Sequence, residues 1–303
     1  MKSKPKTKGT FYIFIPLLIY FIIQFISPFI VTYIIVFKEL DVLLAIFEKQ
    51  GADGIMSYAE VLINDSMYLM LGTTALLTII VGAIMFLCKE RREHDKLYIN
   101  KLKLKNILLA IGLGSAFFLV TNIILTIIFS ITLPNEVSSG YNSTTQMLFS
   151  DNILLGVLIL GILIPISEEL IFRGLCFNRM KEISPTSVSI ISSSFMFALM
   201  HFGSFTQIIY TFALGYLLAY SYNKFENIII PIVINVSFSL MNFVFYIPGL
   251  NDLLNNTIGL LAYYFIAVAV ATITFKAIKR KPKVLLQNAQ NEAQNEQANI
   301  DSL

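Results

Sequence analysis

The chain has 303 residues, of which 56% are hydrophobic and only 14% are charged. An ordinary soluble domain carries about 25% charged residues, and a chain of this length has no aqueous core that could hold so much apolar surface. The sequence therefore excludes a water-soluble fold and predicts an integral membrane protein. The net charge of +3 does not by itself indicate an anionic partner, and no nucleotide-binding fingerprint is present.

Several apolar segments are long enough to be candidate transmembrane helices, since a helix needs about 20 apolar residues to cross a bilayer. The fold is therefore predicted to be all-α, a polytopic membrane helix bundle of about eight transmembrane helices. The first segment is too long for a signal peptide, whose apolar region has about 7 to 15 residues, and is predicted to stay as an anchor. The expected spans are residues 11–37, 67–88, 107–133, 153–178, 186–202, 205–222, 228–248 and 256–277.

The distribution of Lys and Arg predicts the orientation, because cytoplasmic loops of membrane proteins carry an excess of these residues. In the eight-span arrangement, 20 of the 22 Lys and Arg residues fall on one side, and only Lys38 and Lys49 fall on the other. We therefore expect a multi-pass protein of the cell membrane with both termini in the cytoplasm. Anionic membrane lipids are sufficient partners for the basic loops, so no nucleic-acid partner is predicted.

The chain divides into four predicted regions. Residues 1–152 hold the first three spans with their loops, 153–248 hold spans four to seven, 249–286 hold the last span with a basic end, and 287–303 form a polar tail. The tail is too polar to bury a core and is predicted to be disordered. The loop 38–66 alternates acidic and apolar residues and is predicted to form a short helix outside the bilayer.

Ionisable side chains within the predicted spans are few: Glu168, Glu169 and Arg173 in span four, and His201 near the end of span five, with Lys276 at a membrane edge. Such groups are costly in a bilayer and mark functional sites by default. Glu169 and Arg173 are one helical turn apart, so an internal ion pair is a purely structural interpretation of these two. That pair does not explain Glu168, which points about 100 degrees away around the helix. Glu168 is therefore a candidate general base.

Glu168 and His201 are predicted to lie close together because they are equally far in sequence from the turn between spans four and five. Spans four and five join near Ser184 and Pro185; Glu168 precedes Ser184 by 16 residues, and His201 follows Pro185 by 16 residues. In a helical hairpin both side chains then stand at the same height, roughly 24 Å above the turn. We expect the carboxylate and the imidazole to meet.

Span seven adds a polar stripe of Asn235, Ser239 and Asn242. Their spacing lines one helix face, and Asn235 is roughly 12 Å into the membrane, at the depth expected for Glu168. Amides and hydroxyls in membrane helices also form purely structural hydrogen bonds between helices, which is the alternative reading of this stripe. If the stripe instead belongs to a functional site, the acids, the imidazole and the amides are expected to lie together beneath an opening to the cytoplasm.

Two of these segments resemble motifs of the CAAX protease and bacteriocin-processing family of intramembrane proteases. The stretch SEELIFRG, Ser167 to Gly174, resembles the family's E-E-x-x-x-R motif, and Phe197 to His201 resembles its F-x-x-x-H motif. The resemblance covers spans four to seven and implies hydrolysis of a peptide bond within the bilayer. It implies that Glu168 and His201 activate water, while Glu169 and Arg173 form a scaffold. The residues assigned to catalysis are Glu168, Glu169, His201 and Asn235, and those assigned a supporting role are Arg173, Phe197, Ser239 and Asn242.

The third family motif is altered. It is typically H-x-x-x-N, whereas Asn235 and Ser239 stand at those two positions here. An Asn amide can still donate to an oxyanion, and loss of one such donor typically costs roughly 100- to 1000-fold in rate. We therefore expect an intramembrane endopeptidase that acts on a peptide or membrane-protein substrate at a cytoplasm-facing cavity. The alternative is a catalytically impaired member that serves as a membrane scaffold or regulator of a partner protein. A proton-coupled transporter is a third reading, but no broken-helix pair is visible.

The sequence is compatible with hydrolysis with or without a bound metal ion. Glu168, Glu169 and His201 offer two carboxylates and one imidazole, which could hold Zn²⁺. A single histidine within the spans makes this ligand set small, so hydrolysis without a metal is the alternative. The resemblance suggests prenylated C-terminal motifs or bacteriocin leader peptides as substrates, but no residue identifies either.

Overall fold

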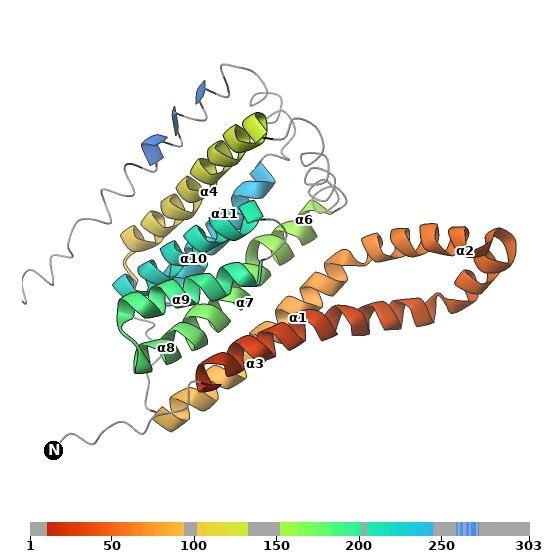
Figure 1. Cartoon of the computed structure of the whole chain (residues 1–303), viewed down its shortest axis with the longest axis horizontal. Coiled ribbons are helices and arrows are strands. Elements are labelled where there is room, and N and C mark those ends of the chain that lie inside the picture. The colour runs from red at the N-terminus through yellow and green to blue at the C-terminus, as the bar shows by residue number, and fades with distance from the viewer. Residues whose placement is uncertain are drawn as a thin grey trace, which may run out of the picture.

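A computed structural model of the chain describes residues 11–93, 102–132, 152–201 and 205–244, with isolated helical positions between 259 and 272. Throughout these residues the secondary structure is helical, without strands (Figure 1), which confirms the predicted all-α membrane bundle. The predicted eighth span lies largely outside the described residues, and the polar tail lies wholly outside them. The helices long and apolar enough to cross a membrane are Tyr12–Lys38, Met67–Leu87, Leu104–Ile124 and Ile153–Ile183, with shorter apolar helices at Thr186–Leu199 and Ile229–Val244.

The helices match the first seven predicted spans to within a few residues at each end. They are α1 (Phe11–Lys38), α2 (Leu40–Asp65), α3 (Met67–Glu93), α4 (Leu104–Thr132), α6 (Ile153–Gly156), η1 (Val157–Leu163), α7 (Ile164–Glu169), η2 (Leu170–Phe177), α8 (Asn178–Ile183), α9 (Thr186–Leu199), α10 (Phe205–Phe225) and α11 (Ile229–Val244).

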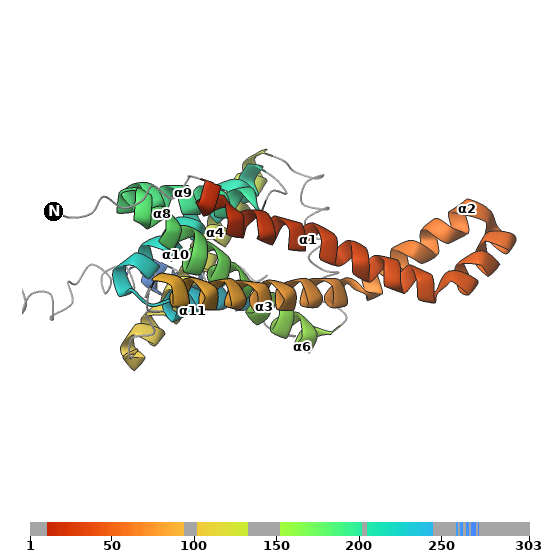
Figure 2. The same cartoon turned by 90° about the horizontal axis from the view of Figure 1, so that it is seen from below.

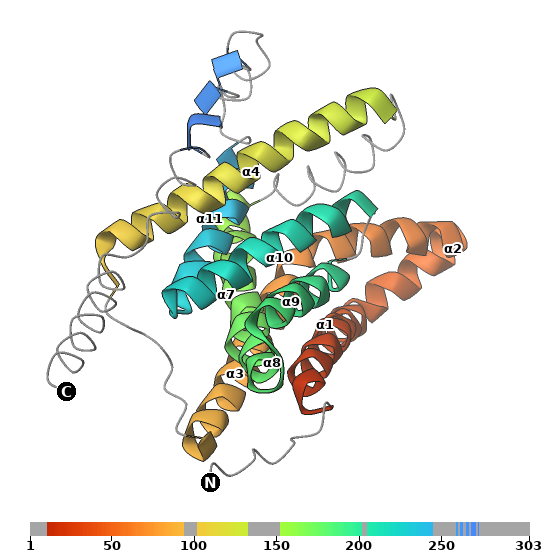
Figure 3. The ribbon, with the colours of Figure 1, turned by 60° about the vertical axis from the view of Figure 1, so that its left-hand side comes forward.

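The central element is the helical run 153–183, which comprises α6, η1, α7, η2 and α8. Helices α1, α3, α9 and α11 pack around it, α10 packs against α9, and α4 packs against α11 (Figure 3). The segments η1 and η2 are wide π-helical turns on either side of α7. Such turns are rare and are found frequently at functional sites. Here they flank the turn that carries the two adjacent glutamates.

The segment 38–66 is more than the short helix predicted for it. Helix α2 is broken at Gly51, whose φ of 68° and ψ of −157° lie outside helical values, a conformation that glycine adopts readily. The chain reverses there, so α1, the two arms of α2, and α3 form one long hairpin that projects beyond the rest of the bundle (Figure 2). Across the hairpin, Tyr58 Oη donates a hydrogen bond to Glu39 Oε2 at 3.2 Å.

Close helix contacts set the position of α11. A Cβ atom at Gly114 of α4 would overlap with the carbonyl oxygen of Ile234 and lie 2.8 Å from Cβ of Ser237. Small residues let transmembrane helices approach until their backbones touch. Gly114 therefore fixes α11, and with it Asn235, against α4.

The outer faces of the helices carry large exposed apolar side chains. On α1, for example, Phe29 is 72% exposed and Tyr33 is 71% exposed. Exposed apolar surface of this extent is unusual for a soluble monomer and marks contact with another apolar phase. It agrees with a helical bundle whose outer surface faces lipid.

Candidate active site

The structure brings Glu168 and His201 together, as predicted. Helix α8 ends at Ile183, and α9 begins at Thr186 after an extended Ser184, so the two helices form the expected hairpin. His201 Nε2 lies 3.1 Å from Glu168 Oε1. The other ring nitrogen, Nδ1, lies 2.8 Å from the carbonyl oxygen of Phe197. Because a carbonyl oxygen only accepts, Nδ1 carries a hydrogen, and one further proton lies between Nε2 and the carboxyl group of Glu168.

Asn235 joins the two glutamates. Its Nδ2 donates to Glu168 Oε2 at 2.9 Å and to Glu169 Oε1 at 3.1 Å. The residue is only 2% exposed. An amide nitrogen has two hydrogens, so both are committed to carboxylate oxygens. Asn235 therefore holds the two acids side by side, although their side chains leave the helix in different directions.

Glu169 and Arg173 form the predicted ion pair. Arg173 Nη1 lies 2.8 Å from Glu169 Oε1, and neither side chain is exposed. Arg173 Nη2 also donates to the carbonyl oxygen of Gly215 in α10 at 3.0 Å. Glu169 Oε2 and Arg173 Nε are buried without a hydrogen-bond partner among the described residues. The pair thus ties α7 and η2 to α10.

Small residues make the Gly215 contact possible. A Cβ at Gly215 would lie 3.1 Å from Cα of Ser194 and 3.2 Å from the ring of Phe197. Ser193 Oγ also donates to the carbonyl oxygen of Phe172 at 3.4 Å. These contacts bring α9, α10 and η2 close enough for a backbone carbonyl to reach Arg173. We did not predict Gly215 from the sequence; the small residues SSS at 192–194 in span five are the only signal for this close packing.

Aromatic rings hold the imidazole in place. The ring of Phe197 packs edge-on against Phe172, with 5.1 Å between centroids, and lies 4.4 Å from the centroid of His201. The guanidinium carbon of Arg173 lies 4.6 Å from the centroid of Phe197, within the range of a cation–π contact. Phe197, predicted as a supporting residue, therefore contacts both the histidine and the arginine.

Burial differs across the site. The side chain of Glu168 is 7% exposed and that of His201 is 23% exposed, whereas Glu169 and Arg173 are fully buried. The inner pair is thus sealed in the protein, while the outer pair retains an accessible edge at the imidazole.

The other two residues of the predicted stripe, Ser239 and Asn242, are half-buried. Asn242 Nδ2 donates to the carbonyl oxygen of Ser239 at 3.2 Å, within its own helix. The structure therefore places one amide of the stripe, Asn235, against the carboxylates, and turns the amide of Asn242 toward the backbone of α11.

The arrangement of Glu168, Glu169 and His201 tests whether these predicted zinc ligands could bind Zn²⁺. Among the residues that the structure describes, no group of three or more His, Cys, Asp or Glu side chains is arranged to hold a metal ion. Of the predicted ligands, Glu168 and His201 face each other, but Glu169 Oε1 is engaged by Arg173 and Asn235. Two convergent donors are fewer than the three protein ligands of catalytic zinc sites. These residues, as arranged, do not fit a zinc centre.

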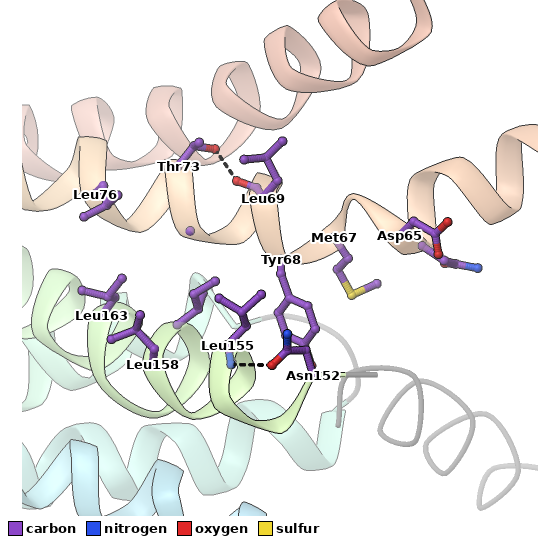
Figure 4. Close-up of a pocket in the computed structure, with 13 residues that line it drawn as sticks. Asp65, Met67, Tyr68, Leu69, Thr73, Leu76, Asn152, Leu155, Leu158 and Leu163 are labelled. Carbon is purple, nitrogen blue, oxygen red and sulfur yellow. Dashed lines mark hydrogen bonds between the residues drawn. The ribbon is translucent and has the colours of Figure 1, made fainter. Parts of the chain in front are cut away.

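An apolar cavity lies away from this site, between α3 and the start of the central run (Figure 4). It has a volume of about 600 Å³ and is lined by apolar side chains such as Leu69, Leu76 and Leu158, with polar residues that include Asp65 and Asn152. None of its lining residues belongs to the carboxylate cluster.

Comparison with known proteins identifies the family. The family model described as Type II CAAX prenyl endopeptidase Rce1-like matches residues 150–241, which contain Glu168, His201 and Asn235. The UPF0177 protein YxdF of Lactococcus lactis subsp. lactis (strain IL1403) is 33% identical over 132 residues, which cover 42% of this chain and 71% of that protein. No solved structure matches. The chain therefore belongs to the CAAX protease and bacteriocin-processing family of membrane proteins.

Proposed function

We propose that the protein is an intramembrane endopeptidase in which Glu168, paired with His201, activates a water molecule for attack on a peptide bond. The observation that carries the proposal is the 3.1 Å contact between His201 Nε2 and Glu168 Oε1. These residues are 33 positions apart in a membrane bundle, with Glu168 in α7 and His201 in the turn that follows α9. A structural ion pair is already provided by Glu169 and Arg173, so packing alone gives no reason for a second acid.

The proton between the two groups suits a hydrolysis cycle. With that proton on the imidazole, Glu168 is a carboxylate and accepts a proton from water as the hydroxide adds to the peptide carbonyl. The pair then returns a proton to the leaving nitrogen as the carbon–nitrogen bond breaks. The products are a carboxylic acid and an amine, and the enzyme regains its starting state. The Nδ1 contact with the Phe197 carbonyl keeps the imidazole oriented throughout.

In this proposal the remaining polar groups position Glu168. Asn235 donates to Glu168 Oε2 and so leaves Oε1 directed toward His201. Arg173 compensates the charge of Glu169, so the negative charge available to react is that of Glu168. Asn235 stands where the resemblance expects a histidine, and its contacts support a role in positioning the acid.

We further propose that the substrate is a peptide or a segment of a membrane protein that reaches the site from the cytoplasm, and that both termini of the enzyme are cytoplasmic. The orientation follows from the distribution of Lys and Arg. The accessible edge at His201 supports a route for water and substrate, since hydrolysis within a bilayer needs a polar cavity.

The test uses the purified full chain in detergent micelles. The probes are a farnesylated, internally quenched CAAX peptide and a mixture of quenched peptides of random sequence. We expect the wild type to cleave at least one probe, and His201→Ala to lose at least about 100-fold in rate because the general-base pair is broken. Cleavage by His201→Ala at the wild-type rate would refute the catalytic assignment. A folded wild-type chain that cleaves neither probe would instead favour the scaffold reading.

We also propose that hydrolysis needs no metal ion. The donor set supports this, because Glu169 is held by Arg173 and Asn235 rather than directed toward Glu168 Oε1. Incubation with EDTA or 1,10-phenanthroline is therefore expected to leave the rate of probe cleavage unchanged. Loss of activity with a chelator, and its return on addition of Zn²⁺, would contradict a metal-free site.

A further inference from the structure

The two walls of the apolar cavity, α3 and the start of the central helical run, lie in a fixed register. A Cβ atom at Gly72 of α3 would lie 3.1 Å from Ile159 Cδ1, and a Cβ atom at Gly82 would lie 2.9 Å from Leu170 Cδ2. Ten residues separate the two glycines and eleven separate their two partners. The walls therefore run in the same direction and advance together.

This register gives the cavity the depth of one membrane leaflet. It extends from Asp65 to Leu76 on one wall and from Asn152 to Leu163 on the other. Each wall thus advances by 11 residues, which corresponds to roughly 16 Å along a helix. The hydrocarbon core of a bilayer is about 30 Å thick, so the cavity reaches from one membrane surface to about the centre.

The polar end of the cavity is the end at the membrane surface. The candidate spans Met67–Leu87 and Ile153–Ile183 supply the two walls, and they begin just after Asp65 and Asn152. Figure 4 shows these two polar residues at one end of the cavity and leucine side chains at the other. An occupant with a polar head and an apolar tail matches this division.

The deeper part of the walls is apolar and accessible from the lipid phase. The side chains of Leu69, Leu76 and Leu158 line the cavity and are exposed. Thr73 Oγ1 donates to the carbonyl oxygen of Leu69 at 2.7 Å, so its hydroxyl is satisfied within α3. Apolar walls without a filling group lose dispersion contacts. An acyl chain that enters from the bilayer restores these contacts.

The charge at the polar end selects the head group. Asp65 is the only charged residue among the described lining residues, and the amides of Asn64 and Asn152 accompany it. In the described part of the chain, Asp65 has no salt-bridge partner. A lipid tail is as apolar as leucine, so chain burial alone does not distinguish one lipid from another. A carboxylate does distinguish them, because it attracts an ammonium group and repels a head group that is only anionic.

We propose that this cavity binds one acyl chain of a phospholipid whose head group carries an amine, with the ammonium group beside Asp65. The volume of about 600 Å³ is within the usual range for small-molecule sites, about 300 to 1,000 Å³. The site shares no lining residue with the carboxylate cluster. The lipid site is therefore a second binding site, and it does not depend on the proposed peptidase function.

The test uses fluorescence, because the chain has no tryptophan and one introduced tryptophan reports on the lipid beside it. Leu76→Trp places the reporter at the deep end of the cavity, and Leu158→Trp repeats the measurement on the opposite wall. Leu77→Trp is the matched control, since Leu77 is 45% exposed against 48% for Leu76 but does not line the cavity. The full chain is reconstituted in phosphatidylglycerol vesicles that contain phosphatidylethanolamine with brominated acyl chains, which quench tryptophan on contact.

We expect both cavity reporters to be half-quenched at a mole fraction of brominated phosphatidylethanolamine about threefold lower than Leu77→Trp requires, an enrichment that one exposed ion pair can support. Brominated phosphatidylglycerol in phosphatidylethanolamine vesicles is expected to show no enrichment. Adding Asp65→Asn to Leu76→Trp is expected to abolish the difference between the two lipids. Asp53→Asn is the control for the acid, because Asp53 is exposed on the same helix and lies outside the cavity lining.

Two results would overturn the inference. If both cavity reporters are quenched in the same way as Leu77→Trp, the cavity does not hold a lipid chain. If both brominated lipids are enriched equally, or if Asp65→Asn keeps the preference for phosphatidylethanolamine, the amine is not recognised by Asp65 and the assigned lipid class is wrong. The peptidase function is tested separately by probe cleavage.

Discussion

Arg173 is the only cation in contact with the buried Glu169 among the described residues. Replacing it by Met keeps much of its volume but leaves a carboxylate without compensation in the core. Removing one partner of a buried pair typically costs about 3 to 5 kcal/mol. We expect Arg173→Met to lower the melting temperature of the purified chain sharply.

Lys181→Met is the matched control for that experiment. Lys181 donates to Asn223 at 2.9 Å in an exposed position, and exposed substitutions usually change stability by no more than about 0.5 kcal/mol. Equal melting temperatures for the two variants would show that Arg173 does not stabilise the core.

Asn235 offers a second test at the residue scale. Asn235→Leu removes both donors between the two glutamates, so the carboxylates repel each other without a bridge, and cleavage is expected to fall by at least about tenfold. Asn235→His restores the residue that the family pattern expects and can still donate, so it is expected to retain or exceed wild-type activity. Rates of probe cleavage decide this, and a fully active Asn235→Leu variant would exclude a role for the amide.

The charged residues of the site, together with Asn235 and Phe197, were predictable from the sequence, while the backbone carbonyl group of Gly215 was not. A charge inside an apolar span is conspicuous because it is costly, and equal distances from one turn located Glu168 and His201 at one height. The Gly215 carbonyl leaves no such signal, since every residue has one. The same periodicity grouped Ser239 and Asn242 with Asn235 because it gives the face of a residue but not its contacts.

At the scale of helices, glycine contacts position α11. A Cβ at Gly114 would overlap with the Ile234 carbonyl oxygen, so Gly114→Ala must push α11 and Asn235 away from α4. Overpacking of this kind typically costs about 1 to 3 kcal/mol, and we expect a lower melting temperature with slower cleavage.

Gly174→Ala is the control for Gly114→Ala. Gly174 directly follows Arg173, the last residue of the glutamate and arginine motif, yet a Cβ there would meet its nearest neighbours at 3.7 Å, an ordinary contact distance. We expect it to fold and cleave as the wild type does. If Gly114→Ala is tolerated as well as Gly174→Ala, close packing of α4 on α11 is not what holds Asn235.

The helices themselves were predictable because hydropathy and length mark a membrane span directly. Their irregularities were not. The π-helical turns at η1 and η2 replace one helical hydrogen-bond pattern with another and leave the hydropathy of the span unchanged. The reversal at Gly51 was likewise missed, since a glycine within 38–66 is compatible with a helix break or with a loop.

At the scale of the whole molecule, the proposed orientation of the protein in the membrane can be tested by cysteine labelling. Ala52 follows Gly51, where α2 reverses, at the tip of the hairpin formed by α1, α2 and α3. In the sequence, Asp95 lies among the basic residues between the predicted spans 67–88 and 107–133. In intact cells, a membrane-impermeant maleimide is expected to label Ala52→Cys, and to label Asp95→Cys only after permeabilisation. The reverse pattern would place the termini and the basic loops outside the cell.

Whether Glu168 activates water is measured most directly by the single-turnover rate of probe cleavage for the wild type, Glu168→Gln and Glu182→Gln. Gln keeps the shape of the side chain but cannot accept the proton. The rate for Glu168→Gln should be lower by at least about 100-fold, whereas Glu182→Gln, an exposed position outside the site, should match the wild type. Equal rates for all three proteins would contradict a hydrolytic role for the Glu168 and His201 pair.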